Sequence, residues 1–300
     1  MVLVVVLLLI SVLVPYVLSF SLSSISSLLQ ASNFRDSFYA LRMARSGIEG
    51  AIALLERDDP SFDSLHDVWA TSFLTVFVGE GNLSVKIEDE DGKININLLV
   101  RRDGKEVDRR IERHLRGVIR RIGGNPDIVD ALIDWIDKDD EPTGSLGAES
   151  NYYRERGYPC KNGPVESVEE LFLIRGFDRE ILVDKGLLGY ITIFPTDGRI
   201  NVNTAPKEVL YTLHPEPREG LCEEIERRRR EAPLKKIQDL RDVIGISAPL
   251  YSRIMPFVKV NSNIFRIEST YTIGKVRKRV EVTVRREEKR SRALVWREPL

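Results

Sequence analysis

The chain carries no charged side chain over its first 34 residues, and Arg35 is the first charge. Residues 1–18 are almost entirely Val, Leu and Ile, close to the ~20 residues that a helix needs to span a bilayer. A cleavable secretory signal is the alternative, but such a peptide has a positive n-region and a small-residue cleavage site. No n-region is seen here, and residues 19–21 form only a weak site. We therefore expect a membrane-spanning helix.

A helical pattern continues beyond this apolar segment. After a Ser-rich stretch over residues 19–27, apolar residues recur at helical spacing as far as Leu55. Asp58, Asp59 and Pro60 then predict the end of the helix. A helix over most of residues 1–57 would be about 85 Å long, with a possible kink at Pro15. Such a helix, apolar at its start and amphipathic at its end, is suited to assembly with partner helices.

The charge balance and the few cysteines exclude several classes of protein. Lys and Arg number 45 against 46 Asp and Glu in 300 residues, which argues against a general polyanion binder. Cys160 and Cys222 match no zinc pattern, because the three histidines are isolated from them. Those histidines, which we expect to be structural or exposed, are His66, His114 and His214. The two cysteines could pair in an oxidising compartment, but nothing in the sequence brings them together.

A short motif is repeated in the middle of the chain. Residues 91–97, Asp-Gly-Lys-Ile-Asn-Ile-Asn, recur at 197–203 as Asp-Gly-Arg-Ile-Asn-Val-Asn. Asp-Gly before an alternating segment predicts a turn that enters a strand. Each copy is followed by a short helical pattern that ends at Gly and an apolar residue, at 168–177 and 237–246. Two copies of one module are predicted, and the first is longer by a segment close to residues 130–163.

That extra segment contains a dense acidic cluster. Five carboxylates lie within residues 134–141, and Glu149 follows after a Thr-Gly-Ser-Leu-Gly loop. Like charges this close repel unless a cation lies among them, and they adjoin aromatic residues such as Trp135 and Tyr153. Hard oxygen ligands around a flexible loop are what calcium prefers. The sequence therefore predicts a calcium site.

The cluster is not an EF-hand. Asp137, Asp139 and Glu141 fit its first, third and fifth positions, but Pro142 replaces the required Gly and Glu149 comes one residue late. A polar helix end followed by a solvated loop is one alternative, and a carboxylate pair for glycoside hydrolysis is another. No arrangement of His, Lys or Ser nearby supports catalysis, so we expect a protein that is not an enzyme.

Strand patterns flank the modules. Residues 83–88 alternate before the first Asp-Gly turn, and residues 263–273 and 275–284 form a predicted hairpin around Gly274. The expected fold class is α+β, with a long helix, an antiparallel sheet and helical modules inserted before the last strands.

The second module allows a different function. Its opening, residues 200–210, resembles that of helix-hairpin-helix DNA-binding modules, including those of membrane-tethered DNA-uptake receptors. In such modules a Gly-containing hairpin offers backbone N–H groups to phosphates. Here residues 214–220 and Gly245 lack that hairpin chemistry, and Arg227 to Arg230 are expected to pair with neighbouring glutamates on a solvated helix face. The repelling glutamates are Glu216, Glu219, Glu223, Glu224 and Glu226. A membrane-anchored DNA-binding receptor remains the alternative function.

The order of the motifs also resembles a known family. The motifs are the apolar N-terminal helix, residues 44–55, 91–97 and 131–137, Gly147 to Glu149 with Tyr152 and Tyr153, residues 168–171, and residues 201–206. Together they resemble the K-type minor pseudopilin of the type II secretion system, the general secretion pathway protein K family, over nearly the full length.

The resemblance implies a pilin-like fold with inserted helical modules (SAM-like or helix-hairpin-helix-like) and structural calcium. The implied calcium ligands are Asp134, Asp137, Asp139 and Glu149, with Asp140, Glu141 and Asn151 as weaker candidates. The implied partners are the I-type and J-type minor pseudopilins and the major pseudopilin, at the tip of a periplasmic pseudopilus. The chain would be a single-pass inner-membrane protein with its bulk in the periplasm.

The implied division of the chain follows these motifs. We expect an N-terminal transmembrane and assembly helix over 1–58, first pilin-like strands over 59–105, a first helical module with the metal-binding insertion over 106–190, a second helical module over 191–256, and completing strands over 257–300. Pilin-like precursors carry a basic leader that prepilin peptidase removes, whereas Met1 already lies in the apolar helix. Processing by that peptidase is expected if a leader exists upstream.

Overall fold

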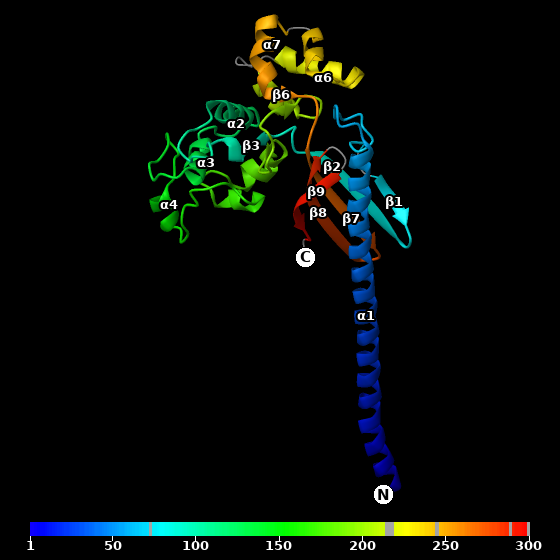
Figure 1. Ribbon diagram of the computed structural model, residues 1–300. Coiled ribbons are helices and arrows are strands. Elements are labelled where there is room, and N and C mark those ends of the chain that lie inside the picture. The colour runs from blue at the N-terminus through cyan, green and yellow to red at the C-terminus, as the bar shows by residue number, and fades with distance from the viewer. Residues whose placement is uncertain (72–73, 214–218, 244–245, 288–289, 299–300) are drawn as a thin grey trace.

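The structure is a computed structural model that describes residues 1–71, 74–213, 219–243, 246–287 and 290–298. Helix α1 (Val2–Arg57) runs unbroken through Pro15 and ends at Asp58, whose backbone is extended. Its apolar part protrudes from the head as a stem (Figure 1), and its most apolar 18-residue window, with mean hydropathy 2.9, buries none of its surface. The predicted long helix and its end are confirmed. By length and composition this helix can cross a membrane.

The upper part of α1 packs on an antiparallel sheet in the order β1-β2-β7-β8-β9. The strands are β1 (Leu74–Val78), β2 (Gly81–Asp89), β7 (Ile264–Ile273), β8 (Val276–Glu287) and β9 (Arg290–Arg297). The helix approaches closely because Ala40, Ala44 and Gly47 face the sheet, while Ile48 and Leu55 fill the space between them. A Cβ at Gly47 would collide with Ser269 Oγ, so this position requires glycine.

The predicted strands lie in this sheet. Residues 83–88 belong to β2, and the hairpin around Gly274 joins β7 to β8 with Ile273 opposite Val276. Gly274 has a φ of +54°, which glycine adopts without the steric conflict that a Cβ introduces. Strands β1 and β9, at the two edges of the sheet, were not predicted.

The repeated motif forms two equivalent short parallel pairs. Strand β3 (Ile94–Asn95) pairs with β4 (Ile191–Thr192), and β5 (Ile200–Asn201) pairs with β6 (Val258–Lys259). Each predicted strand is only two residues long, because a side chain of the motif then turns the backbone. Asn95 accepts from the Asn97 N–H at 3.0 Å, and Asn201 accepts from the Asn203 N–H at 3.0 Å.

The last asparagine of each motif makes the same connection in both copies. Asn97 bonds to both the N–H and the carbonyl of Val165, at 2.8 and 2.9 Å. Asn203 bonds to both the N–H and the carbonyl of Leu234, at 3.0 and 2.9 Å. Val165 and Leu234 each stand three residues before a short 3₁₀ helix, η2 (Val168–Leu173) or η5 (Ile237–Asp242). The repeat in the sequence is therefore a repeat in three dimensions.

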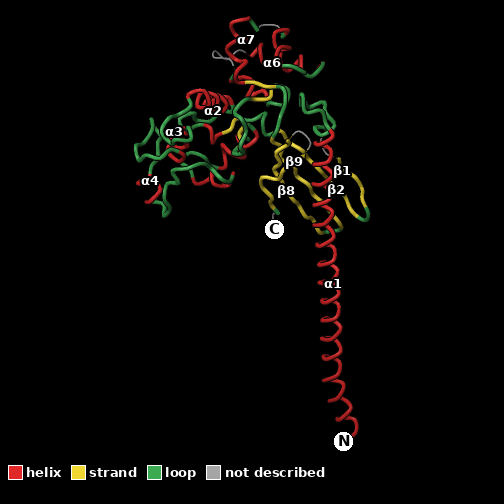
Figure 2. The backbone as a smooth tube through the Cα atoms, in the orientation of Figure 1, coloured by secondary structure: helices red, strands yellow, loops and turns green. Residues whose placement is uncertain are grey.

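Short helices and loops make up the rest of both modules (Figure 2). The first contains α2 (Arg109–Arg121), α3 (Ile128–Ile136), α4 (Ser150–Arg154), the π-helical turn η3 (Glu180–Asp184) and η4 (Leu187–Gly189), besides η1 (Ile96–Leu98) near its start. The second contains α5 (Lys207–Thr212), α6 (Glu219–Glu231), α7 (Ala248–Ile254) and η6 (Met255–Phe257). Both lie around the end of the sheet that is remote from the free end of α1 (Figure 1). One buried apolar cluster extends through them.

A buried polar junction, defined by Asp63, Asp89, Asp91, Asn201 and Ser262, joins the sheet to the modules. The Asp89 carboxylate accepts from Ser262 Oγ at 2.6 Å and from Thr204 Oγ1 at 2.5 Å. Asn201 Nδ2 donates to the Asp63 carbonyl at 3.1 Å. The chain crosses between the sheet and the modules at these residues, so the junction fixes their relative position.

Candidate metal centre

Helix α3 positions the acidic segment. Asp130 and Asp134 lie one turn apart on it, and both hold the loop that follows. Asp134 accepts from the Thr143 N–H at 3.0 Å and the Ala148 N–H at 2.6 Å. Asp130 accepts from the Ser145 N–H at 2.9 Å, and its other oxygen pairs with Arg116 of α2. The two carboxylates fold residues 143–148 back against the helix.

This loop closes tightly because Gly147 lacks a side chain. A Cβ there would collide with the Thr143 carbonyl oxygen and lie 2.6 Å from Asp134 Oδ2. The close approach brings Glu149, at the start of α4, beside Asp137 at the end of α3. The roles of Asp130 and Arg116 were not predicted from the sequence. The spacing of Asp130, one helical turn before Asp134, was the available signal.

Three of the four predicted ligands come together. One carboxylate oxygen from each of Asp134, Asp137 and Glu149 lies within 4.8 Å of the others. Their residues are only 0%, 6% and 4% exposed, so the alternative of a solvated loop is wrong for them. Asp137 Oδ1 and both oxygens of Glu149 have no hydrogen-bond partner among the described residues. We call these three residues the α3–α4 cluster.

The charge of this cluster is uncompensated. Burial, with the charges of Asp139 and Asp134, raises the pKa of Asp137 to about 7. Burial and the neighbouring Asp134 and Asp137 raise the pKa of Glu149 to about 8. Burial also raises the pKa of Asp134, against the hydrogen bonds from Thr143 and Ala148. Three buried carboxylates with elevated pKa values are the environment that a divalent cation would stabilise.

The residues fit a hard cation. Unpaired buried carboxylate oxygens are costly, and a cation that accepts their lone pairs removes that penalty. Oxygen ligands on a loop match the preference of calcium. Next to Asp134 in the chain, the buried Trp135 packs edge-on against the buried Tyr153 with ring centroids 4.9 Å apart.

The remaining candidates lie outside the cluster. Asp139 is exposed, and its Oδ1 accepts from the Glu141 N–H at 2.9 Å. Asp140 accepts from Ser150 Oγ at 2.6 Å, and Glu141 and Asn151 are exposed. Asp139 and Asp140 still act on the cluster, because their charges contribute to the raised pKa of Glu149.

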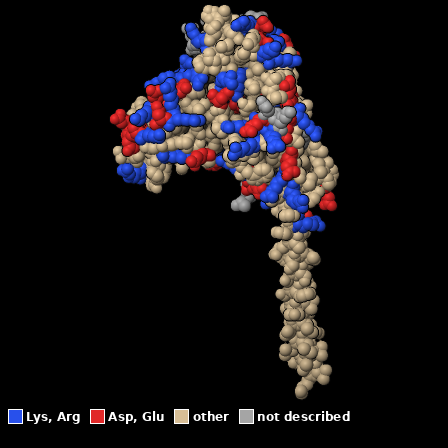
Figure 3. Space-filling model, in the orientation of Figure 1, with Lys and Arg blue, Asp and Glu red and all other residues tan. Residues whose placement is uncertain are grey.

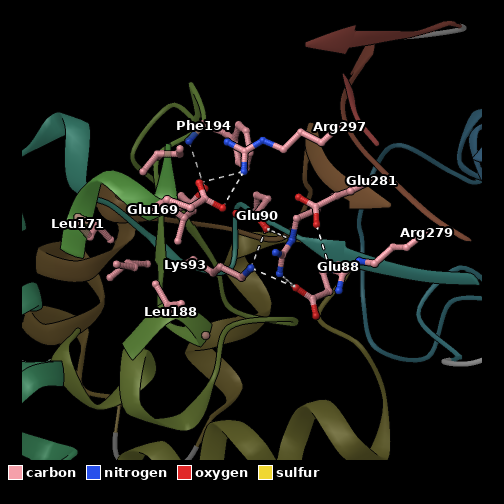
Figure 4. A pocket seen from close by; sticks show the side chains of 16 residues that line it. Glu88, Glu90, Lys93, Glu169, Leu171, Leu188, Phe194, Arg279, Glu281 and Arg297 are labelled. Carbon is pink, nitrogen blue, oxygen red and sulfur yellow. Dashed lines mark hydrogen bonds and ion pairs between the residues drawn. The ribbon is translucent and has the colours of Figure 1, made fainter. Parts of the chain in front are cut away.

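Apart from this cluster, a hollow with a volume of about 360 Å³ lies between the sheet and the first module (Figure 4). Arg297 of β9 reaches across it to Glu169 of η2 at 3.3 Å. Lys93 lies between Glu90, at 2.7 Å, and Glu88, at 3.3 Å. Each charged residue labelled in Figure 4 has an oppositely charged partner. These ion pairs connect two parts of the head across the hollow, and none of the labelled charges remains unpaired for a ligand.

The predicted pairing on a solvated face is confirmed for Arg227 and Arg230 of α6, whereas Arg229 is largely buried and Arg228 donates to the Ala232 carbonyl. Arg227 bridges Glu224 and Glu231, and Arg230 pairs with Glu226 at 3.7 Å. Arg229 donates to the carbonyls of Val202 and Ala205. The surface mixes both signs of charge over the head and has no charge along the lower stem (Figure 3). The expected hairpin residues 214–218, with His214 and Glu216, and Gly245 lie outside the described residues.

The other histidines and the cysteines have structural positions. His114 is buried, and its Nδ1 lies 3.0 Å from Thr212 Oγ1, which ties α2 to α5. His66 is exposed and contacts the Arg229 carbonyl at 2.8 Å. Cys160 and Cys222 are buried and form no disulfide with each other.

Comparison with known proteins finds similarity to the family that the sequence motifs resemble. Residues 92–196, the first module, match the family model described as "Type II secretion system (T2SS), protein K". The chain is 32% identical over 158 residues to the type II secretion system protein K of Pseudomonas aeruginosa, covering 50% of this chain and 46% of that protein. The match therefore spans about half the length of that relative. The protein of the same name from Aeromonas hydrophila is 25% identical over 256 residues, which cover 75% of this chain and 76% of that protein.

A solved structure shares the fold. A chain in the crystal structure of the GspK-GspI-GspJ complex from the enterotoxigenic Escherichia coli type 2 secretion system aligns with a TM-score of 0.74 at 17% identity. The alignment covers 90% of this chain and 99% of that chain.

A long apolar helix on an antiparallel sheet, with helical modules inserted between its strands, defines the class of pilin-like subunits. The fold class expected from the sequence is confirmed. Within that fold, this chain is similar to the protein K family of the type II secretion system, through the family model over residues 92–196 and the relatives of that name. These names describe a component of secretion machinery, in agreement with the expectation of a protein that is not an enzyme, and they give the DNA-binding alternative no support.

Proposed function

We propose that this chain is a minor pseudopilin at the tip of the type II secretion pseudopilus. There it assembles with I-type and J-type minor pseudopilins to initiate or cap the pseudopilus during protein export. The major pseudopilin continues the shaft below it. Helix α1 anchors the chain in the inner membrane, and the head faces the periplasm. The Escherichia coli complex, in which GspK is joined to GspI and GspJ, supports this assignment.

The observation that carries the proposal is the shape of the molecule. The stem is a single bare helix, whereas both modules widen the head beyond the sheet that α1 covers (Figure 1). A subunit inside a helical shaft must be enclosed by copies above and below it. A head this broad fits only at an end, where its upper surface remains open.

Calcium bound at the α3–α4 cluster holds the extra segment of the first module in this proposal. The ion would accept the unpartnered oxygens of Asp137 and Glu149 and offset three buried charges. Asp139 is the fourth proposed ligand and would need to move toward the cluster, since its side chain is exposed here. Calcium supplies structural stability and no chemistry.

Cysteine cross-linking in cells tests the assembly. Both natural cysteines are buried, so an added cysteine on the surface will react selectively. Leu28, on the stem, is 71% exposed. We expect Leu28→Cys to cross-link to a cysteine placed in the N-terminal helix of the I-type pseudopilin, in cells lacking their own protein K.

The matched control is Arg154→Cys on α4, which lies far from the stem (Figure 1) and should not cross-link to that helix. The same cells report function, because the unsubstituted chain should restore secretion of a type II substrate. Equal cross-linking at both positions, or none at Leu28→Cys while secretion is restored, would contradict the proposed packing.

Thermal melting of the chain in detergent micelles tests calcium. At calcium 100-fold above its Kd we expect about 2.7 kcal/mol of stabilisation and a rise in Tm of roughly 5 to 10 °C. Asp137→Asn with Glu149→Gln should abolish this rise. In chelator the same variant should melt at or above the unsubstituted chain, because two buried like charges are gone.

The control for this experiment is Glu155→Gln with Glu166→Gln. These exposed residues of the same module lose the same charge but should keep the calcium response. A melting curve of the unsubstituted chain that chelator leaves unchanged would refute calcium at this cluster. The pseudopilin assignment would still stand, since the cross-linking does not depend on the ion.

A further inference from the structure

A second group of carboxylates lies at the C-terminal end of α1, inside the head and remote from the protruding stem (Figure 1). Asp58 ends α1, and Asp63 and Asp67 belong to the loop that leads to β1. One oxygen from each lies within 4.8 Å of the others. We call these three residues, which lie at the head end of the helix that forms the stem, the stem-end cluster. They share no residue with the α3–α4 cluster and belong to a different part of the chain.

The hydrogen bonds of Asp63 leave one oxygen unused. Asp63 is fully buried, at 0% exposure, and its Oδ2 accepts from the Ser262 N–H at 2.6 Å and from Arg286 Nη2 at 2.5 Å. Its Oδ1 is buried and has no hydrogen-bond partner in the described part of the chain, and the same is true of Asp58 Oδ2. Asp63 Oδ1 is therefore a fully buried oxygen of the cluster without a donor, whereas Asp58 lies close enough to the Trp69 indole for its N–H to lower the pKa of Asp58.

Arg286 compensates this cluster only in part, and its buried Nη1 has no hydrogen-bond partner among the described residues. Its Nη2 is already bonded to Asp63 Oδ2 and to the Ser262 carbonyl, and its Nη1 lies 3.8 Å from Asp58 Oδ2, beyond hydrogen-bond distance. One guanidinium against three carboxylates leaves two negative charges uncompensated. Burial and the charge of Asp67 raise the pKa of Asp58, which is the repulsion that a further cation would relieve.

We infer that the stem-end cluster is a second divalent-cation site, with Asp58 Oδ2, Asp63 Oδ1 and a carboxylate oxygen of Asp67 as its protein ligands. Each of the three residues has an oxygen within 4.8 Å of the others, a spacing close to what calcium requires, since its ligands lie about 2.3–2.6 Å from the ion. Magnesium, at about 2.0–2.1 Å, requires the three oxygens to draw closer together.

The position of the ion gives it a mechanical role. Asp58 directly follows the last residue of α1, and Asp63 is bonded through Ser262 and Arg286 to the start of β7 and the end of β8. An ion shared by Asp58 and Asp63 connects the helix end directly to the sheet. It would hold the C-terminal end of α1 against the sheet, so that the whole helix and the head move together.

Terbium luminescence of the full chain in micelles tests this site. Terbium replaces calcium at oxygen sites, and each cluster has its own tryptophan to sensitise it: Trp69 is two residues from Asp67, and Trp135 follows Asp134. We expect Asp58→Asn with Asp67→Asn to lower terbium affinity at the stem-end cluster by about tenfold or more, and calcium to compete. These substitutions spare the Asp63–Arg286 pair and so retain the buried ion pair.

The control is Asp59→Asn, an exposed carboxylate in the same loop that should bind terbium as the unsubstituted chain does. The chain with Asp137→Asn and Glu149→Gln isolates the new site and should keep the emission that depends on Trp69. Loss of all terbium binding in that chain, or unchanged binding with Asp58→Asn and Asp67→Asn, would overturn the inference. If the double variant fails to fold, Trp69→Phe with all carboxylates intact decides, because it should remove that emission alone.

Discussion

At the scale of single residues, the head depends on polar side chains that are buried with defined partners. His114 is one of them: it is 3% exposed and holds α2 against α5 through Thr212. Burial, together with the charges of Arg113 and Arg110, lowers the pKa of His114 to about 4. The neutral imidazole is therefore the form that the fold accepts.

This lowered pKa predicts a loss of stability in acid. Between pH 6.5 and pH 4 the unfolded chain binds a proton at His114 that the folded chain refuses, so stability falls as the pH falls through this window. The loss should reach about 2 to 3 kcal/mol at pH 4.5. His114→Gln should flatten this dependence in thermal melts at pH 7, 5.5 and 4.5. The exposed His66→Gln is the control, and a flattening with His66→Gln alone would contradict the assignment.

At the scale of elements, the contact between α1 and the sheet is set by one glycine. Gly47 faces Ser269 of β7 and also Leu83 and Val85 of β2, which would lie 3.0 and 3.1 Å from an added Cβ. Rotation of Ser269 alone would not relieve those two contacts. Gly50, one turn later on the outer face, has nothing within 4 Å of such an atom.

These two glycines form a matched pair for mutation. Gly50→Ala should stabilise the chain by up to about 1 kcal/mol, since alanine favours the helix. Gly47→Ala should destabilise it by roughly 1–3 kcal/mol, because the overpacked interface outweighs the same gain in helix propensity. Melting temperatures of the two variants check the difference. Equal shifts would show that α1 does not approach the sheet as closely as described.

Elements whose signals lie within a few neighbouring residues could be predicted from the sequence, whereas features that depend on contacts between distant segments could not. Helix α1 and the β7–β8 hairpin were predicted because their signals are local: an uncharged run, an Asp-Asp-Pro end and a Gly turn. Edge strand β9 was missed because its pairing with β8 contains a register shift at Thr283 and Val284, which local alternation does not reveal. Carboxylate density predicted a cation site in this segment, and the family resemblance supplied Asp134, Asp137 and Glu149 among its ligands. Asp139 has the same chemistry and spacing, but only its exposure separates it from Asp137, and exposure depends on tertiary packing.

At the scale of the whole molecule, the polar junction decides whether the head behaves as one unit. Asp89 ends β2 and accepts hydrogen bonds from Asn201 and Thr204 of the second module and from Ser262 before β7. A single carboxylate thus connects three segments that are distant in the sequence. The sheet and the second module should therefore unfold together.

Asp89→Ala should separate them. The substitution leaves several buried donors without an acceptor and should destabilise the head by roughly 3–5 kcal/mol. Calorimetry should then show the second module melting before the sheet, where the unsubstituted chain shows one joint transition. Asp59→Ala, an exposed residue, is the control. A single sharp transition in the Asp89 variant would mean that the apolar core couples the two parts without the junction.

The ends of the insertion have a consequence for how such a molecule can evolve. The chain leaves the sheet at Asp89 and returns at Ile264, and Asp89 is the register partner of Phe265. The segment between these residues, which contains both modules, is inserted where β2 and β7 could otherwise be joined as a hairpin. A two-residue turn is enough to join two strands at such a place. Extra sequence at such a tip leaves the strand register untouched. A small ancestral subunit could therefore have gained both modules by insertion of one module at this tip, followed by its duplication and enlargement. Conversely, a short engineered turn that joins Asp89 to Ile264 should leave a minimal pilin-like core of α1 and the sheet.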